Sequence, residues 1–467
     1  MQRRQGCRRA YGRVHFLLTQ RTVTMKKAAL ALSLVLAIPL SGWSQSLDDA
    51  VAAIARNDYP AAVAIYNKLA AGGDAKAQAQ LGLMYMQGAG VAADPATAAG
   101  WLRKAADQGN ATAQSNLGVL YQHGKGVPKD EVEAARLYRL AADQGYASAQ
   151  FNLAQAYTTG TGVPRDLAQA ASWTRKAADQ DVLQALYNMG SMYYQGEGVA
   201  RDEREAVKWF RKAGEKGSAQ AVHNLGYMFA AGQGGLQKDE KKAAKLYTVA
   251  AEQGFAASQH NLGGLYEQGL GMAADPAKAL EWYRKAAAQG FADSQNAIGA
   301  MYLEGKGVGK DEAEALRWFQ RAADQGHAVA QLNVARRYQL GQGVAADPAR
   351  AIDWYTKAAD QGNVAAMGEL AAIYASGEGT PANPKLVVEL LTRAARKGDG
   401  ESQFKLGALY AKGEIISQNM ELAYFWLALA SARGNAAAAQ YRDRVVKSLN
   451  PAQIRRGDMN IRAFRAQ

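Results

Sequence analysis

The octapeptide HGKGVPKD, residues 123–130, combines residue types found in phosphate-binding loops: two glycines, two lysines and a histidine. Such a loop needs the spacing G-x-x-x-x-G-K-[S/T], after a strand and before a helix, so that backbone N–H groups and the lysine surround the phosphate. Here Gly118 and Gly124 are one residue too far apart, and Gly126 stands where the magnesium-binding hydroxyl belongs. The preceding segment, AQSNLGVLY, has helical rather than strand spacing. These residues therefore do not predict a phosphate site.

The same loop returns about every 36 residues, for example as GTGVPRD (160–166), GEGVARD (196–202) and GKGVGKD (305–311). A leucine-glycine-like pair precedes each loop at a constant distance, and its first residue is Leu81, Leu117, Leu153, Met189, Leu225, Leu262, Ile298, Val334, Leu370 or Leu406. Ten copies at a fixed period are typical of a solenoid rather than of a catalytic loop. One copy, GQGGLQKD (232–239), carries an extra residue near Gly235.

One repeat, residues 111–145, predicts two helices joined by this loop. Ala113, Leu117, Gly118 and Tyr121 share one helical face, which we expect to be buried. Gly118 costs about 1 kcal/mol of helix propensity, so its recurrence indicates a close contact between helices. A second-helix column, in which tryptophan alternates with leucine, indicates packing, because a ligand stack would not accept an aliphatic residue.

Carboxylate pairs at the start of the second helix could be mistaken for acid–base dyads. Asp130 and Glu133 have the spacing of a capping box, and Asp202 with Glu205 and Asp311 with Glu314 repeat it. Because the pairs recur with the period of the loops, we interpret them as helix caps.

The formal net charge of +13 is concentrated at the two ends of the chain. Residues 1–44 contain eight basic residues and no acid, and residues 441–467 contain seven basic residues against Asp443 and Asp458. Between 45 and 440, basic and acidic residues are equal in number, at 40 each. This balance gives no positive stripe along which a nucleic acid could bind.

The N-terminal segment has the three-part pattern of an exported protein. From Met25, MKKAALALSLVLAIPLSGWSQS contains two lysines, a short apolar run and then small residues, as in a secretory signal peptide. We expect a signal peptide over 25–44, with Gln45 as the first mature residue, in the periplasm or outside the cell. Residues 1–24 are interpreted as a misassigned upstream extension; a long charged leader is the alternative. The apolar run is too short for a stable membrane anchor.

The repeat pattern A-x-A-Q-x-N-L-G-x-x-Y-x-x-G-x-G-V-x-x-D, followed by W-x-x-K-A-A-x-Q-G, closely resembles the Sel1-like repeat, a longer relative of the tetratricopeptide repeat. The resemblance covers residues 73–434. It implies an all-α fold, a right-handed α/α superhelix of about ten helix-turn-helix units whose first helices line the concave side. It also implies an adaptor that holds other proteins, since bacterial members are often exported and serve in envelope signalling, assembly or host contact.

The two ends are expected to close the array. Residues 45–72 indicate a degenerate opening helix pair, and 435–467 indicate basic capping helices, which terminal units of a solenoid require. The basic cap could instead bind anionic lipid or an acidic partner.

An enzyme would need residues that break the repeat pattern, and the sequence offers few. It has no G-x-S-x-G and no H-E-x-x-H motif, and Cys7, the single cysteine, lies in the upstream extension. His123 and His327 fall in turns and are expected to be solvated, whereas His223 and His260 occupy one slot in consecutive repeats without nearby third ligands. We therefore predict no enzymatic activity, no cofactor and no metal site.

The predicted binding surface lies on the first helices, at slots two before, two after and five after the leucine of each pair. By the 100° step per residue, these slots point away from the buried stripe and toward the concave side that the resemblance implies. An asparagine column runs beside them. The predicted partner-binding residues are Asn116, Phe151, Asn152, Tyr187, Asn188, Tyr194, His223, Asn224, Tyr227, His260 and Asn261.

Two ligand classes fit this surface. A protein or peptide is favoured because exposed aromatic rings beside amides are typical of binding hot spots. A glycan or peptidoglycan partner is the alternative, since aromatic surfaces without charge also suit sugars. The rings could also pack against neighbouring first helices, which would make them part of the core. We expect a monomer that binds no nucleic acid.

Overall fold

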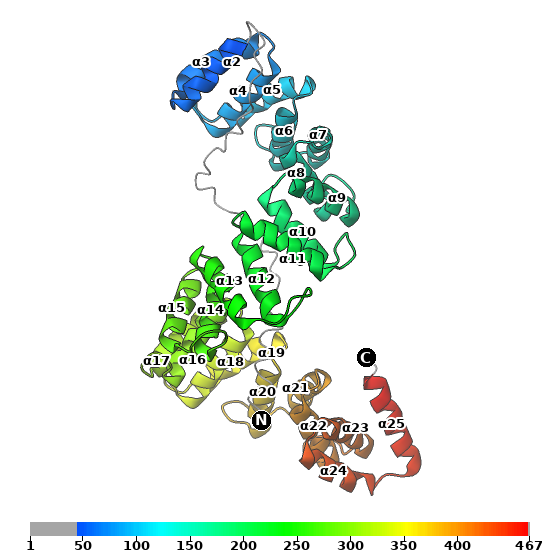
Figure 1. The fold of residues 1–467 in the computed structure, drawn as a ribbon. Coiled ribbons are helices and arrows are strands. Elements are labelled where there is room, and N and C mark those ends of the chain that lie inside the picture. Colours follow the sequence, from blue (N-terminus) through cyan, green and yellow to red (C-terminus); the bar gives the residue numbers. More distant parts are fainter. Residues whose placement is uncertain (1–43, 466–467) are drawn as a thin grey trace.

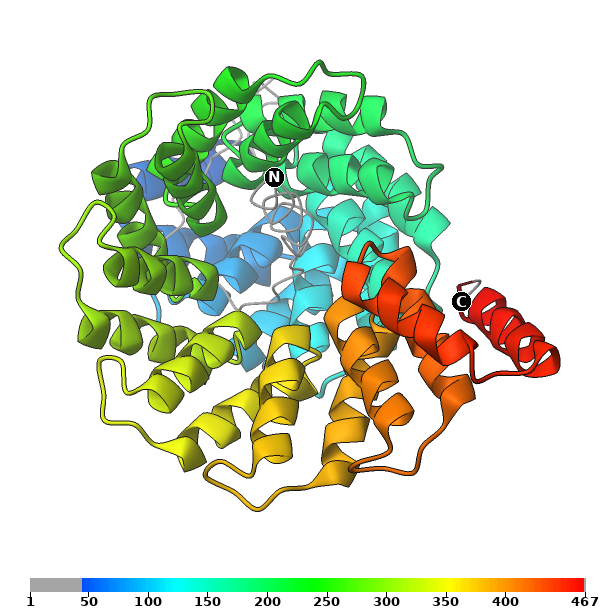
Figure 2. The ribbon, with the colours of Figure 1, turned by 90° about the horizontal axis from the view of Figure 1, so that it is seen from below.

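The chain is a row of helices that winds around one axis. The computed structural model describes residues 44–465, and within this range it has 24 helices and no strand. The helices follow one another along the length of the molecule (Figure 1). Seen along the axis, they circle counter-clockwise as they approach the viewer, so the superhelix is right-handed (Figure 2). The predicted α/α solenoid is confirmed.

Ten helix pairs form the body of the array, and each of their helices has 13 residues. The first helices are α4 (Ala75–Gln87), α6 (Ala111–His123), α8 (Ala147–Thr159), α10 (Leu183–Gln195), α12 (Ala219–Ala231), α14 (Ala256–Gln268), α16 (Ala292–Glu304), α18 (Ala328–Leu340), α20 (Val364–Ser376) and α22 (Gly400–Lys412). The second helices are α5 (Pro95–Asp107), α7 (Glu131–Asp143), α9 (Leu167–Asp179), α11 (Glu203–Glu215), α13 (Glu240–Glu252), α15 (Pro276–Ala288), α17 (Glu312–Asp324), α19 (Pro348–Asp360), α21 (Pro384–Arg396) and α23 (Met420–Ala432).

Two further helices lie at each end: α2 (Ser44–Ala55) and α3 (Tyr59–Ala71) before the repeats, and α24 (Ala436–Val446) and α25 (Pro451–Arg465) after them. Except for Ser44, the predicted upstream extension (1–24) and signal peptide (25–44) lie outside the described residues.

The C-terminal helices differ from a repeat in both sequence and packing. In α24, Arg442 and Asp443 occupy the two positions that Leu117 and Gly118 hold in α6, and they form an ion pair of 2.7 Å. The last helix, α25, packs against α23. There, the hydroxyl of Tyr424 donates to Asp458 at 2.7 Å.

Aspartate caps begin eight of the ten second helices, as predicted, and asparagine caps α21 and α23, but the capping boxes are only half formed. Asp130 Oδ1 accepts a hydrogen bond from the N–H of Glu133 at 2.9 Å. In the predicted box, the Glu133 carboxylate would accept from the N–H of Asp130. Instead, that N–H donates to the carbonyl of Tyr121 at 3.0 Å, and Glu133 pairs with Arg136 at 2.7 Å. The same arrangement occurs at Asp202 with Glu205 and at Asp311 with Glu314.

The recurrent glycine of the first helix marks a close contact with the second helix of its own repeat. A Cβ added to Gly118 would lie 2.7 Å from Cε1 of Tyr138, too close for the ring to stay in place. Gly190 meets Phe210 in the same way, at 2.5 Å. The predicted helix contact is confirmed, and its partner is a buried large side chain.

Glutamine side chains join each repeat to its neighbours. Gln114 Nε2 donates to the carbonyl of Ala106 in the preceding repeat at 3.3 Å, and its Oε1 accepts from Gln144 Nε2 at 2.7 Å. This glutamine ladder recurs in most repeats but is interrupted in the fourth, fifth and ninth, where buried Leu186, Val222 and Met367 take the glutamine position. Apolar packing therefore replaces these hydrogen bonds in three repeats.

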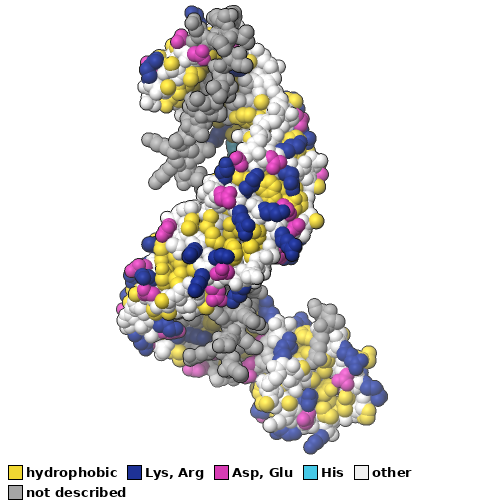
Figure 3. Space-filling view, in the orientation of Figure 1, with side chains coloured by type: hydrophobic (Ala, Val, Ile, Leu, Met, Phe, Trp, Pro, Cys, Tyr) yellow, Lys and Arg dark blue, Asp and Glu magenta, His cyan; other side chains and the backbone are white. Residues whose placement is uncertain are grey.

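The tryptophan column packs, as predicted. Trp173 is 5% exposed, and the ammonium of Lys176 lies 3.7 Å from its ring centroid. Where leucine replaces tryptophan, at Leu137, the residue three positions later is Leu140 rather than a cation. On the face of the central repeats that Figure 3 shows, Lys and Arg side chains lie among hydrophobic ones.

Two irregularities in the sequence change the structure only locally. Asp181 takes the left-handed conformation, at φ 60°, in a position that glycine holds in most other repeats, and it pairs with Lys216 at 2.7 Å. The extra residue near Gly235 lies in the loop, because α12 and α13 both keep 13 residues.

Candidate interaction surface

First helices of neighbouring repeats contact one another directly. α4 meets α6 and α10 meets α12, and the Asn333 side chain in α18 donates to Asn296 Oδ1 in α16 at 2.9 Å. In a curved stack the units are closest on the concave side, so these helices line that side. We define the inner face as the side chains of the first helices that occupy the predicted binding slots and the adjacent asparagine column.

Four predicted aromatic residues, Phe151, Tyr187, Tyr194 and Tyr227, are half-buried on the inner face. Tyr187 packs on Phe210 with ring centroids 5.8 Å apart, and burial raises its pKa above the usual value. These rings thus combine a packed side with an edge that remains accessible.

The hydroxyl of Tyr194 reaches across to the loop of the next repeat. It donates to Gln233 Oε1 at 3.1 Å, and burial raises its pKa. The electrostatic effect of the Tyr227 hydroxyl also raises the pKa of Tyr194.

His223 and His260 lie between first helices rather than in solvent. His223 is only 7% exposed, and its Nδ1 is 2.8 Å from Ser258 Oγ in α14. His260 Nδ1 lies 2.9 Å from Ser294 Oγ in α16. Burial lowers the pKa of both imidazoles to about 4. The prediction that this slot faces the open groove is wrong for His223, because the first helix of the next repeat covers it.

The asparagine column is half-buried, and its members differ in their partners. Asn116 donates to the carbonyl of Thr112 in its own helix at 2.8 Å, and Asn188 accepts from Gln184 at 3.0 Å. The Nδ2 of Asn224 is buried and has no hydrogen-bond partner within the described residues. Asn152 and Asn261 occupy the same position in α8 and α14.

The remaining histidines divide between a solvated and a structural role. His123 is exposed at the end of α6. His327, expected to be solvated, instead caps α18: its Nδ1 accepts from the N–H of Ala330 at 3.0 Å, and its Nε2 lies 3.0 Å from Asp293. Within residues 44–465, no group of three His, Cys, Asp or Glu side chains is placed to hold a metal ion.

Charge is segregated between the two layers of helices. Four consecutive first helices, α6, α8, α10 and α12, contain no Lys, Arg, Asp or Glu. The second helix α11, between α10 and α12 in sequence, carries Glu203, Arg204, Glu205 and two lysines. The inner face of these repeats is therefore composed of amides, hydroxyls and aromatic rings.

Two serines and two phenylalanines contact the histidines of the central repeats. They were not singled out from the sequence. Phe255 stacks on His223 at 5.1 Å, and Phe291 on His260 at 5.3 Å. Each phenylalanine takes an N-cap position without providing a side-chain cap. The signal was present, because each histidine is followed one repeat later by an aromatic cap residue and by serine at a position that is alanine in most other repeats.

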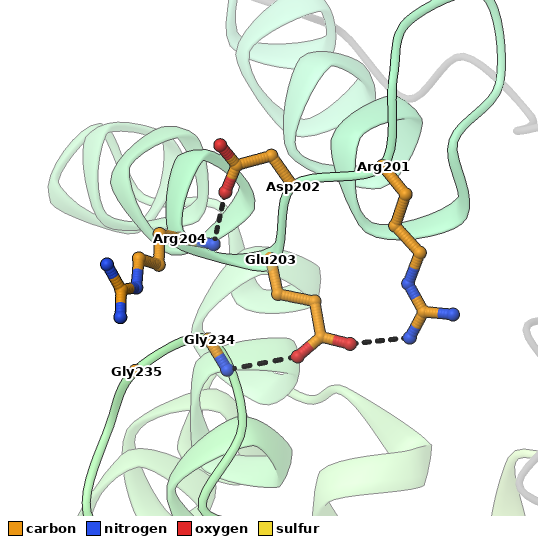
Figure 4. A pocket seen from close by; sticks show the side chains of 6 residues that line it. All are labelled: Arg201, Asp202, Glu203, Arg204, Gly234 and Gly235. Carbon is orange, nitrogen blue, oxygen red and sulfur yellow. Dashed lines mark hydrogen bonds and ion pairs between the residues drawn. The ribbon is translucent and has the colours of Figure 1, made fainter.

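A hollow of about 400 Å³ opens at the start of α11 (Figure 4). Its polar groups serve the fold: Glu203 accepts from the N–H of Gly234 at 3.1 Å and pairs with Arg201 at 2.5 Å, and Asp202 caps the helix. No helix of the described chain is long and apolar enough to span a membrane.

The fold and this surface define an α/α solenoid of tetratricopeptide-like units with a neutral inner face. The Sel1 repeat family model matches ten consecutive segments of residues 75–435, and the chain belongs to this family. Sel1 repeats generally mediate protein–protein interactions on a non-catalytic scaffold. No curated protein sequence matches the chain.

Two solved structures are similar over much of the chain. One is c5321, a protective antigen of uropathogenic Escherichia coli, with 33% identity, a TM-score of 0.72, and coverage of 90% of this chain and 91% of that one. The other is a Sel1 repeat protein from Oxalobacter formigenes, with 34% identity, a TM-score of 0.55, and coverage of 66% and 89%.

Proposed function

We propose that the protein is an exported, non-catalytic scaffold that holds a protein or peptide partner on the inner face of its central repeats. Its place would be the periplasm or the cell exterior, in envelope signalling, assembly or host contact. The observation that carries the proposal is the layer segregation: half-buried rings and amides line one side of α8, α10 and α12, while ionic residues lie on the second helices.

The family and the sequence support the two parts of this proposal separately. Sel1 repeats generally bind proteins, and the related E. coli protein is described as a protective antigen, which fits a role in host contact. The segment from Met25 supports export, since its lysines, apolar run and small residues form a signal-peptide pattern.

The test of binding replaces amides that make few contacts with other side chains of the protein. Asn152→Ala with Asn188→Ala removes two half-buried groups from adjacent first helices, and Gln169→Ala removes an exposed amide from the second helix α9. We expect a partner cross-linked in envelope extract to be captured by the wild type and by Gln169→Ala, and to be lost from the double variant. Equal capture by all three folded proteins would refute the proposed surface.

The test of export is the N-terminal sequence of the native protein. We expect it to begin near Gln45, in the periplasmic or secreted fraction. A cytoplasmic form that retains residues 1–24 would refute this part of the proposal.

A further inference from the structure

The chemistry of the inner face narrows the class of ligand. Along α6, α8, α10 and α12, its groups are side-chain amides such as Asn152, hydroxyls such as Ser191 and Thr158, and tyrosine edges. Arg201 lies 5.9 Å from the centroid of the Tyr194 ring but is paired with Glu203, so a charged ligand group on this face would lose water without gaining an unpaired opposite charge. Amides and hydroxyls instead donate to and accept from uncharged peptide groups.

The spacing between repeats favours a ligand in an extended conformation. Axes of packed helices lie about 8–10 Å apart, so equivalent side chains recur along the inner face at about that distance. Three residues of polyproline II backbone advance about 9.3 Å and bring the same side of the ligand back to the face. Two residues of β-strand advance only about 6.6 Å and would fall out of step after one repeat.

We propose that the inner face of α6, α8, α10 and α12 binds an uncharged, extended peptide segment with three residues per repeat, in the polyproline II conformation. This inference rests on the proposed scaffold function and specifies its ligand. A polyproline II chain has no internal hydrogen bonds, so its carbonyls and N–H groups are free to meet the asparagine column. Its apolar side chains pack against the edges of Tyr187, Tyr194 and Tyr227.

A neutral glycan fits this face less well than a peptide does. Sugar rings bind by stacking on open aromatic faces, whereas Tyr187 already packs on Phe210. The tryptophans of the second helices are occupied in the same way, since cations such as Lys176 and Lys285 lie 3.7 Å from their ring centroids.

The first experiment uses a displayed library of random peptides of about 12 residues, three for each of four repeats. Binders are selected on the folded wild-type protein and counter-selected on Asn152→Ala with Asn188→Ala. We expect the enriched peptides to be depleted of Lys, Arg, Asp and Glu, to show a three-residue period, and to bind with little dependence on salt.

The other outcomes separate this inference from the proposed function. Enriched peptides that are charged and salt-sensitive, yet still lost on the double variant, would overturn the ligand class and leave the scaffold intact. Binding of a neutral β-1,4-linked N-acetylglucosamine oligosaccharide in place of any peptide would overturn the peptide proposal. If neither probe binds, the inference fails, and the partner-capture test alone decides the scaffold function.

The second experiment places a charge on the inner face. Ser191→Glu changes a half-buried residue of α10, and Ser172→Glu makes the same change at an exposed position of α9, on the second-helix layer. We expect Ser191→Glu to weaken the selected neutral peptides by about tenfold or more, and Ser172→Glu to leave them unchanged. Equal affinity for all three proteins would overturn the inference.

Discussion

The imidazole Nδ1 of His223 lies 2.8 Å from the hydroxyl oxygen of Ser258, across the interface between α12 and α14. The ring also packs against Tyr247 at 5.3 Å. His260 repeats the arrangement one unit later with Ser294. Two consecutive interfaces therefore depend on a neutral histidine.

The first prediction concerns acid stability. Burial lowers the pKa of both histidines from 6.5 to about 4, so between these values the unfolded chain binds more protons than the folded one. Stability is thus complete above pH 6.5 and falls as the pH drops toward 4, by up to roughly 3 kcal/mol per histidine. Urea unfolding followed by circular dichroism across this range measures the loss.

The control for this prediction is the double variant His223→Gln with His260→Gln, which removes both titrating groups. We expect its unfolding midpoint to depend much less on pH between 4 and 6.5. Carboxylates with lowered pKa, such as Asp181, which hydrogen-bonds Lys216, lose their contribution only at lower pH. A wild type as flat as the variant would contradict the structural role of the histidines.

The second prediction compares two glycines in first helices. Gly190→Ala would place a methyl group 2.5 Å from the ring of Phe210, which is 1% exposed and cannot move aside. We expect it to lower the free energy of unfolding by about 1–3 kcal/mol. Gly368→Ala meets nothing within 4 Å and should raise stability by about 0.5–1 kcal/mol through helix propensity. Two changes of equal sign would show that the glycine contact is unimportant.

The third prediction concerns Arg337, which is 8% exposed at a position that is apolar in the other repeats, as at Met301. Its Nε and Nη1 have no hydrogen-bond partner in the described chain, and burial lowers its pKa. Arg337→Met should therefore raise the melting temperature, by an amount equivalent to about 1–3 kcal/mol. Arg336→Met breaks only a partly exposed pair with Glu369 and should change stability by less than about 1 kcal/mol. A drop in melting temperature for Arg337→Met would argue against this explanation.

The fourth prediction concerns the loop insertion. A Cβ at Gly235 would meet only the side chain of Arg204, and the flanking helices have the usual length. Deleting Gly235 should leave the helix content and the small-angle scattering curve unchanged, with a small effect on melting. A changed scattering curve at constant helix content would show instead that the insertion bends the superhelix.

The fold could be predicted from the sequence because its determinants are local and repeated. Asp130 marks a helix start, Gly124 marks a helix end in the left-handed conformation at φ 64°, and Gly118 marks a close contact. The capping-box bond could not be predicted, because Glu133 had a competing partner in Arg136 one turn away.

The binding surface was harder to predict because exposure depends on the neighbouring repeat. The helical step does not show that the ring of His223 packs against Tyr247 of its own second helix, α13. It says nothing of the next first helix, which covers that slot and supplies Ser258. Tyr187 is half-buried for a different reason, since it lies against Phe210 in the second helix of its own repeat, α11.

The ion pair of Arg442 and Asp443 determines where the stack can stop. A solenoid whose last unit kept the leucine-glycine surface could add the helices of a second molecule and grow into a filament. At α24, growth would require burial of two charges that now face water, and that desolvation is unfavourable. These two charges therefore disfavour the stacking of a second molecule on α24. Arg442→Leu with Asp443→Gly should convert a particle of constant mass into one whose mass rises with concentration.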